Sequence, residues 1–147
     1  FDLEQILESN KDGIAIVDGV RSLKRGPQHY ASGAKTHPYQ KMLNEVVDTA
    51  GEASAAAQNL TVAVTNSIKF FGGEDRIFLL VQGFKAIGMI RIGSKKLFIR
   101  DEIGNIKEIE PLCVLDFYVH ESYQRSGYGK FIFETMLDEE KIEPNKI

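Results

Sequence analysis

The 147-residue sequence has one cysteine and no long apolar run. The lone thiol, Cys113, excludes a disulfide within the chain and suits a reducing compartment. A membrane span needs about 20 consecutive apolar residues, and no run here approaches that length. The net charge is only −3, so the molecule as a whole does not match nucleic acid, and any anion-binding surface must be local. We therefore expect neither a membrane nor a nucleic acid as partner.

The length and composition predict one globular domain spanning residues 1–147. Domains typically have roughly 100–200 residues, and 43% of the residues here are apolar, which is enough to build a core. Residues 24–38 are polar and contain two prolines and two glycines, which predicts a flexible surface loop within the domain. We see no internal repeat.

Apolar spacing predicts the helices. In residues 39–59 the apolar positions include Leu43, Val46, Val47 and Ala50, which is the spacing of an amphipathic helix. Residues 65–71 predict a short second helix with a Thr or Asn cap. After Gly129, apolar residues recur at helical spacing and predict a helix that packs on a sheet.

Short runs of Ile, Leu, Val and Phe between turn residues predict the strands. These runs are residues 13–19, 76–81, 86–92, 95–100 and 112–119. The Gly-Ser-Lys sequence at 93–95 predicts a tight hairpin, and the run at 112–119 predicts a central strand buried on both faces. The fold class is therefore α+β or α/β, with a meander of antiparallel strands covered by helices.

The last residues, 143–147, predict a loop and the first step of a further strand. A long central strand needs a neighbour on each side, because unpaired backbone groups would form an exposed edge. We therefore expect the domain to be incomplete at its C-terminus.

The sequence Gln-Arg-Ser-Gly-Tyr-Gly at 124–129 lies between the last strand and the last helix. Free N–H groups at a helix start bind phosphate, and glycine lets the ligand approach the backbone. Gly127 and Gly129 could have this role, with Arg125 adding charge. The alternative is a turn glycine followed by a helix-packing glycine. The motif lacks the Gly-Lys-Ser/Thr ending of a Walker loop and the third glycine of a dinucleotide fingerprint.

Residues 110–144, with LDFYVHES and QRSGYG, resemble the α-tubulin N-acetyltransferase family of the GNAT acetyltransferase superfamily. Residues 53–60 and 87–99 are similar to it as well. The resemblance implies a central, mostly antiparallel twisted sheet flanked by helices, and it implies acetyl-CoA as cosubstrate without a metal. It implies the following cofactor-binding residues: Phe117, Tyr118, Val119, His120, Glu121, Ser122, Tyr123, Gln124, Arg125, Ser126, Gly127, Tyr128, Gly129 and Lys130.

The same resemblance implies three catalytic residues, each with an alternative role. Gln58 could orient the substrate with its amide or be a polar residue at a helix end. Asp116 could be a general base or a structural carboxylate paired with a basic side chain. Cys113 matches the family's active-site cysteine or is a small buried hydrophobe. Because positions three apart in a strand point to opposite faces, Cys113 and Asp116 can share a site only across a bulge.

The resemblance implies transfer of acetyl from acetyl-CoA to a lysine of α-tubulin in the microtubule lumen. The implied location is cytoplasmic, on the microtubule cytoskeleton and the ciliary axoneme. Lys95 and Lys96 match basic residues of the family and could bind acidic tubulin, or they could be a solvated turn.

In the family, a second essential aspartate, a further cofactor-binding segment and the remaining strands and helices follow the segment that ends here at Ile147. We therefore expect weak catalysis or none from this chain. The alternatives are a related acetyltransferase with another amine substrate and a non-catalytic fragment that binds tubulin or coenzyme A.

Overall fold

The structure is a computed structural model that describes residues 13–18, 38–82 and 85–147. The predicted flexible loop at 24–38 lies outside these residues, except for Pro38, where the first described helix begins. The larger elements are β1 (Ile14–Asp18), α3 (Pro38–Ala57), α4 (Ser67–Phe71), β2 (Arg76–Gln82), β3 (Lys85–Ser94), β4 (Leu97–Arg100), β5 (Ile106–Ile109), β6 (Leu112–Val119) and α5 (Tyr128–Glu140). Two 3₁₀ turns, η1 (Glu121–Tyr123) and η2 (Pro144–Lys146), complete the order.

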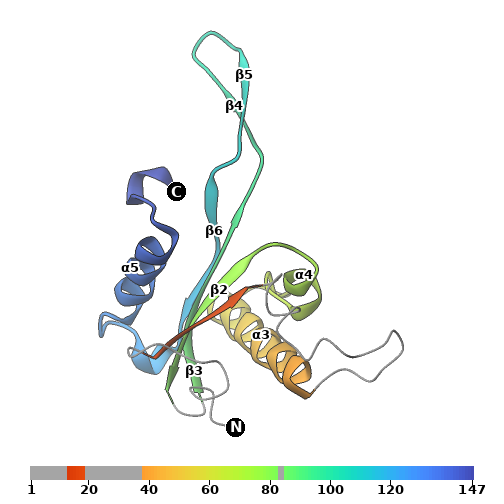
Figure 1. The fold of residues 1–147 in the computed structure, drawn as a ribbon, viewed down its shortest axis with the longest axis vertical. Helices are drawn as coiled ribbons and strands as arrows, with labels where there is room; N and C mark the ends of the chain where they lie inside the picture. The colour runs from red at the N-terminus through yellow and green to blue at the C-terminus, as the bar shows by residue number, and fades with distance from the viewer. Residues whose placement is uncertain (1–12, 19–37, 83–84) are drawn as a thin grey trace.

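The main sheet has the strand order β1-β2-β3-β6, and each neighbouring pair is antiparallel. Figure 1 shows α3 and α4 on one side of this sheet and α5 on the other. The expected α+β fold, an antiparallel sheet flanked by helices, is therefore confirmed. Among the helices of the described residues, none is long and apolar enough to cross a membrane.

Each side of the sheet has its own hydrophobic core. On the α3 side, Leu43 and Val47 of α3 pack with Phe70 of α4 and with the sheet. On the α5 side, Ile132 and Met136 pack against the opposite face of the sheet. The helices predicted from apolar spacing are confirmed as α3 and α5. The apolar spacing puts one stripe of each helix against the sheet, where it is buried.

A β-bulge interrupts the pairing of β3 with β6. Arg91 pairs with Asp116, and Ile92 pairs with Val114, so Leu115 is an extra residue on β6. A bulge of this kind shifts the alternation of side chains by one position. Consequently Cys113 and Asp116 face the same side of the sheet, the side on which their partners Gly93 and Arg91 lie.

The tight hairpin predicted at 93–95 is wrong. Gly93 and Ser94 remain in β3 and pair with Cys113 and Leu112 of β6. The chain then continues into a two-stranded ribbon in which β4 pairs with β5, and Figure 1 shows this ribbon extending beyond the rest of the fold. The reversal occurs at residues 101–105, where Asp101 accepts backbone N–H bonds from Ile103 and Asn105. The run at 106–109 was not predicted as a strand.

The prediction that residues 112–119 form a central strand buried on both faces is also wrong for the described sheet. β6 lies at its edge, and only Asp116 and Val119 of this strand are fully buried. Residues 144–146 form a 3₁₀ turn instead of starting a strand. The proline at the start of that turn has no N–H and so cannot donate to a ladder.

Candidate active site

A pocket of about 360 Å³ joins the end of α3 to the glycine turn. Its walls come from two parts of the sequence that are far apart. The lining residues are Ala57, Gln58, Phe117, Tyr118, Val119, Gln124, Arg125 and Gly129. The pocket therefore brings Gln58 together with the segment predicted to bind a cofactor.

The glycine turn begins α5 with unpaired N–H donors. The first backbone bond of α5 is donated by Phe131 N–H to the Gly127 carbonyl, and no described residue accepts a bond from the N–H groups of 127–130. Gly127 has a φ of +84°, a left-handed conformation that favours glycine, and a Cβ there would meet nothing within 4 Å. The site in front of this turn can accept an anion.

Gly129 has a different role from Gly127. A Cβ at Gly129 would lie 3.2 Å from the Phe117 ring and 3.7 Å from Val119, so this glycine lets α5 pack closely on β6. The turn-and-packing alternative therefore accounts for the local geometry of both glycines. It does not exclude anion binding, because the N–H donors at the helix start are present in either case.

The Asp116 carboxylate is buried and accepts four hydrogen bonds. Its Oδ1 accepts from Ser54 Oγ at 2.7 Å, from Gln58 Nε2 at 3.4 Å and from the Phe117 N–H at 2.9 Å. Its Oδ2 accepts from Thr65 Oγ1 at 2.6 Å. This arrangement fits a structural carboxylate better than a general base, because most acceptor sites of the carboxylate are already occupied.

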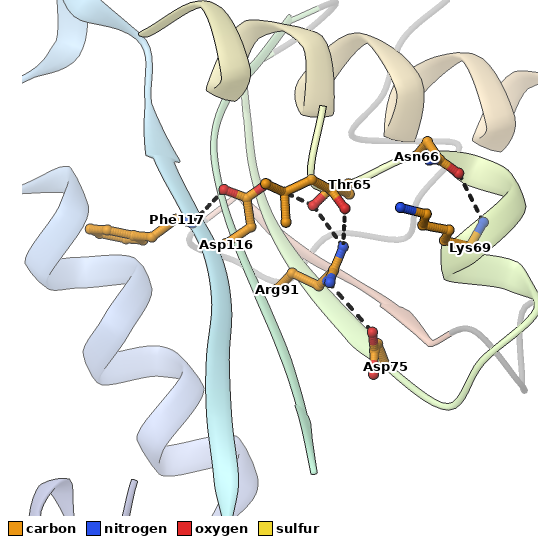
Figure 2. Close-up of polar contacts among 8 residues, drawn as sticks. Thr65, Asn66, Lys69, Asp75, Arg91, Asp116 and Phe117 are labelled. Atoms are coloured by element: carbon orange, nitrogen blue, oxygen red, sulfur yellow. Dashed lines mark hydrogen bonds and ion pairs between the residues drawn. The ribbon is translucent and has the colours of Figure 1, made fainter. Parts of the chain in front are cut away.

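Arg91 lies directly opposite Asp116 across the β3–β6 pair. Figure 2 shows that Arg91 reaches Asp116 through Thr65: Arg91 Nη1 donates to Thr65 Oγ1 at 3.0 Å. The same nitrogen donates to the Val64 carbonyl at 3.0 Å, and the Arg91 guanidinium also pairs with Asp75 at 3.5 Å. We call Ser54, Thr65, Arg91 and Asp116 the Asp116 cluster.

Gln58 follows the last residue of α3 and is exposed. Its Nε2 donates to Ser54 Oγ at 2.9 Å and to Asp116 at 3.4 Å. No described residue donates to its amide oxygen, which can therefore accept a hydrogen bond from a ligand. This geometry suits the substrate-orienting role implied by the resemblance.

Cys113 is half-buried, and its Sγ lies 3.6 Å from the Pro111 carbonyl, to which the thiol donates. Because of the bulge at Leu115, Cys113 and Asp116 lie on the same face of β6, which positions three apart in a strand can do only across a bulge. Cys113 does not line the pocket at Gln58.

Lys95 and Lys96 are exposed and lie where β3 passes into the ribbon. The register places them beyond the Ser94–Leu112 pair, at the opposite end of β6 from the glycine turn. Lys96 Nζ is 3.9 Å from Glu108 of β5, and both side chains are more than half exposed. The structure therefore does not bring these lysines into the pocket at Gln58.

The middle of the predicted cofactor segment forms η1. His120 Nδ1 accepts from the Ser122 N–H at 3.1 Å, and the His120 and Tyr123 rings contact each other edge-on. A second pocket of about 510 Å³ lies between α3 and η1, and Tyr118 lines both pockets. Burial, with the negative charge of Glu121, raises the pKa of Tyr118 above its ordinary value of 10.0.

Sequence reasoning missed Ser54, Thr65 and Arg91. One signal was available: Ser54 precedes Gln58 by four positions, which puts both on one face of a helix. Thr65 could have been recognised once Asn66 was identified as the cap of α4, because Asn66 Oδ1 accepts from the Lys69 N–H and leaves the Thr65 hydroxyl for another partner. Within the part of the chain that the structure describes, no group of three His, Cys, Asp or Glu side chains could hold a metal ion.

Comparison with known proteins identifies similar sequences over the whole chain. A family model described as "GNAT acetyltransferase, Mec-17" matches residues 1–147. The α-tubulin N-acetyltransferase of Tetrahymena thermophila is 48% identical over 118 residues, which are 80% of this chain and 30% of that protein.

Two further relatives are similar along much of the chain. The α-tubulin N-acetyltransferase of Schistosoma japonicum is 36% identical over 157 residues, covering 97% of this chain and 57% of that protein. The α-tubulin N-acetyltransferase 1 of Danio rerio is 38% identical over 123 residues, covering 78% of this chain and 41% of that protein. The chain thus spans between about a third and just over half of the length of these relatives.

Proposed function

The chain belongs to the GNAT acetyltransferase, Mec-17 family, and on this premise we propose that it transfers acetyl from acetyl-CoA to a lysine of α-tubulin. The names of its relatives support this substrate. The proposed setting is the cytoplasm, in the lumen of microtubules and of the ciliary axoneme. The observation that carries the proposal is the pocket that Gln58 shares with the glycine turn.

The residues at the turn fit the phosphates of acetyl-CoA. The N–H groups of 127–130 have no described acceptor, the helix start carries partial positive charge, and the exposed Arg125 side chain lies in the pocket wall. When bound, acetyl-CoA supplies an acetyl group as a thioester, whose C–S bond is replaced by a C–N bond to lysine. The lysine, which arrives as an ammonium, gives one proton to solvent before it attacks and a second to the displaced thiolate.

Gln58 orients the lysine in this proposal. A lysine amine has a reference pKa near 10.4, so it arrives mostly protonated and has N–H groups to donate. The free amide oxygen of Gln58 accepts one of them and holds the nitrogen beside the pocket. On the side away from the lysine, the buried Asp116 carboxylate accepts a hydrogen bond from the Gln58 NH₂ group.

The test uses the chain with acetyl-CoA and polymerised microtubules, and it measures acetyl-lysine on α-tubulin by mass spectrometry. Acetyl-CoA binding is measured in parallel by calorimetry. We expect weak acetylation of α-tubulin, with a kcat about 100-fold lower but still measurable in Gln58→Ala, while acetyl-CoA affinity in that variant stays within about threefold, because Gln58 is assigned to the amine.

Three other outcomes would redirect the proposal. Transfer to a small amine but not to microtubules would mean that the substrate is wrong. Acetyl-CoA binding without transfer to any amine would mean that this chain is a binding fragment. Equal turnover by the wild type and by Gln58→Ala would mean that the amine does not meet Gln58.

A further inference from the structure

The directions of the hydrogen bonds in the Asp116 cluster allow only one orientation of the Gln58 side-chain amide. A carboxylate only accepts, so the single proton of the Thr65 hydroxyl points to Asp116, and the Thr65 oxygen accepts from Arg91. The proton of Ser54 also points to Asp116, so the Ser54 oxygen accepts from Gln58. Gln58 must therefore turn its NH₂ group inward and its carbonyl oxygen outward. The reverse orientation would set that oxygen against the Asp116 carboxylate.

The four members of the cluster are buried, whereas Gln58 is exposed. Thr65 is 0% exposed, Ser54 1%, Asp116 7% and Arg91 8%. Buried polar groups are costly unless they have partners, and a network of partnered groups holds its members in place. Among the described residues, the Arg91 Nε of this cluster makes no hydrogen bond and has only its 3.5 Å ion pair with Asp75. The network thus extends from the buried interior to one amide at the wall of the pocket.

Two glycines make room for the cluster. A Cβ at Gly51 of α3 would lie 1.9 Å from the Thr65 carbonyl oxygen, so the loop carrying Thr65 lies directly against the helix. A Cβ at Gly93 of β3 would lie 2.1 Å from Asp75 Oδ1, and Asp75 pairs with Arg91. The Thr65 loop therefore lies between α3 and Asp116, and the Arg91 guanidinium lies between Thr65 and Asp75.

From this geometry we propose that Ser54, Thr65 and Arg91 are positioning residues that act through Asp116 to set the orientation of the Gln58 amide. The inference rests on the proposed function, because that function gives the oriented amide its substrate. We call the hydrogen bonds that hold the Gln58 amide through Ser54, Thr65, Arg91 and Asp116 the clamp. Asp116 lies at its centre, and the acceptor that faces the lysine is the Gln58 amide oxygen.

The first experiment measures the clamp without measuring turnover. The Gln58 side-chain NH₂ resonances of the isotope-labelled chain are recorded by NMR and assigned by their loss in Gln58→Ala. We expect two well-separated proton shifts and slow solvent exchange in the wild type. We expect a collapse toward the values of a free glutamine in Ser54→Ala and in Thr65→Val. Free-glutamine values in the wild type would overturn the inference, whatever the enzyme does.

The second experiment measures steady-state acetylation of α-tubulin by the same variants. Misplacing a reacting group by about 1 Å can cost on the order of 100-fold in rate, so we expect kcat to fall by about 10- to 100-fold, with a smaller change in the KM for acetyl-CoA. Thr65→Ser keeps the hydroxyl and should recover most of the rate lost in Thr65→Val. Thermal unfolding midpoints identify any variant whose loss comes from unfolding.

A double-mutant comparison separates positioning from a purely structural role. If Ser54 acts through Gln58, adding Ser54→Ala to Gln58→Ala leaves kcat where Gln58→Ala alone left it. Independent, multiplying losses would refute the inference. If the wild type acetylates nothing while its Gln58 amide is held, the clamp stands and the proposed function fails, so the two failures are distinguishable.

Discussion

Replacing Gly51 with alanine tests the packing that supports the candidate site. In the interior of a helix, alanine is more favourable than glycine by about 1 kcal/mol, so helix propensity alone predicts stabilisation. The structure predicts the opposite. The new Cβ would lie 1.9 Å from the Thr65 carbonyl oxygen and 2.8 Å from the Thr65 carbonyl carbon.

The magnitude follows from how far the loop must move. Ordinary contact begins at 3.4 Å, so the Thr65 carbonyl must shift by about 1.5 Å. That shift stretches the 2.6 Å bond from Thr65 to Asp116 beyond hydrogen-bonding distance. Overpacking costs about 1–3 kcal/mol, and an unsatisfied buried polar group costs about 1–3 kcal/mol. After the gain in helix propensity, we expect a net loss of about 1–5 kcal/mol.

The assay is urea unfolding followed by far-ultraviolet circular dichroism, since the chain has no tryptophan to report by fluorescence. The neighbouring residue Glu52 is exposed and supplies the control, as Glu52→Ala and Glu52→Gly. At position 52 alanine should be the more stable residue by about 1 kcal/mol, and at position 51 glycine should be. If alanine is the more stable residue at both positions, the loop does not lie against α3 and the argument fails.

Three further predictions concern the turn, the pH dependence and the ribbon. Gly127→Ala should weaken acetyl-CoA binding, measured by calorimetry, by about tenfold or more, because alanine disfavours the left-handed backbone that aims the N–H groups of the turn at the ligand. The control is Gly104→Ala, which also replaces a left-handed glycine with open space around it and should leave binding unchanged. Equal effects of the two substitutions would mean that the turn does not contact the ligand. The pKa of Tyr118 is raised in the folded chain, so above about pH 10 the unfolded chain loses the Tyr118 proton first and the free energy of unfolding should fall. This fall with pH should be less steep in Tyr118→Phe, and an unchanged pH dependence of the free energy of unfolding in that variant would contradict the prediction. Backbone amides of Ile106–Ile109 should exchange with solvent faster than those of Arg76–Gln82, because a lone two-stranded ribbon is marginally stable, and comparable protection would contradict that picture.

Local patterns were sufficient to predict most helices and strands. The spacing of Leu43 and Val47 predicted α3, and the Asn66 side chain caps α4 as a cap residue should. The family resemblance pointed to Gln58 and the glycine turn, and the structure brings them to one pocket. These features depend on neighbours in the sequence or on a motif, so one sequence is enough to find them.

Features that depend on pairing between distant segments were not predictable in this way. Gly93 and Ser94 have the composition of a turn, yet they stay in β3 because β6 pairs with them and Asp75 occupies the space beside Gly93. The bulge at Leu115 breaks the two-residue period on which strand reasoning depends. Ser54, Thr65 and Arg91 are ordinary polar residues until the fold brings them to Asp116.

The hydrogen bonds of the Asp116 cluster also bear on the order of folding. They join positions 62 and 51 residues apart, from Ser54 and from Thr65 to Asp116. Contacts with such sequence separation carry a large loop-closure entropy and lower the folding rate, whereas helices and hairpins form from near neighbours. The strand–turn–helix segment that carries the glycine turn is local and can form early. The Gln58 amide is oriented by Ser54 and Asp116, so under the proposed function we expect the ability to orient a lysine to arise only when α3 docks on a formed β3–β6 pair.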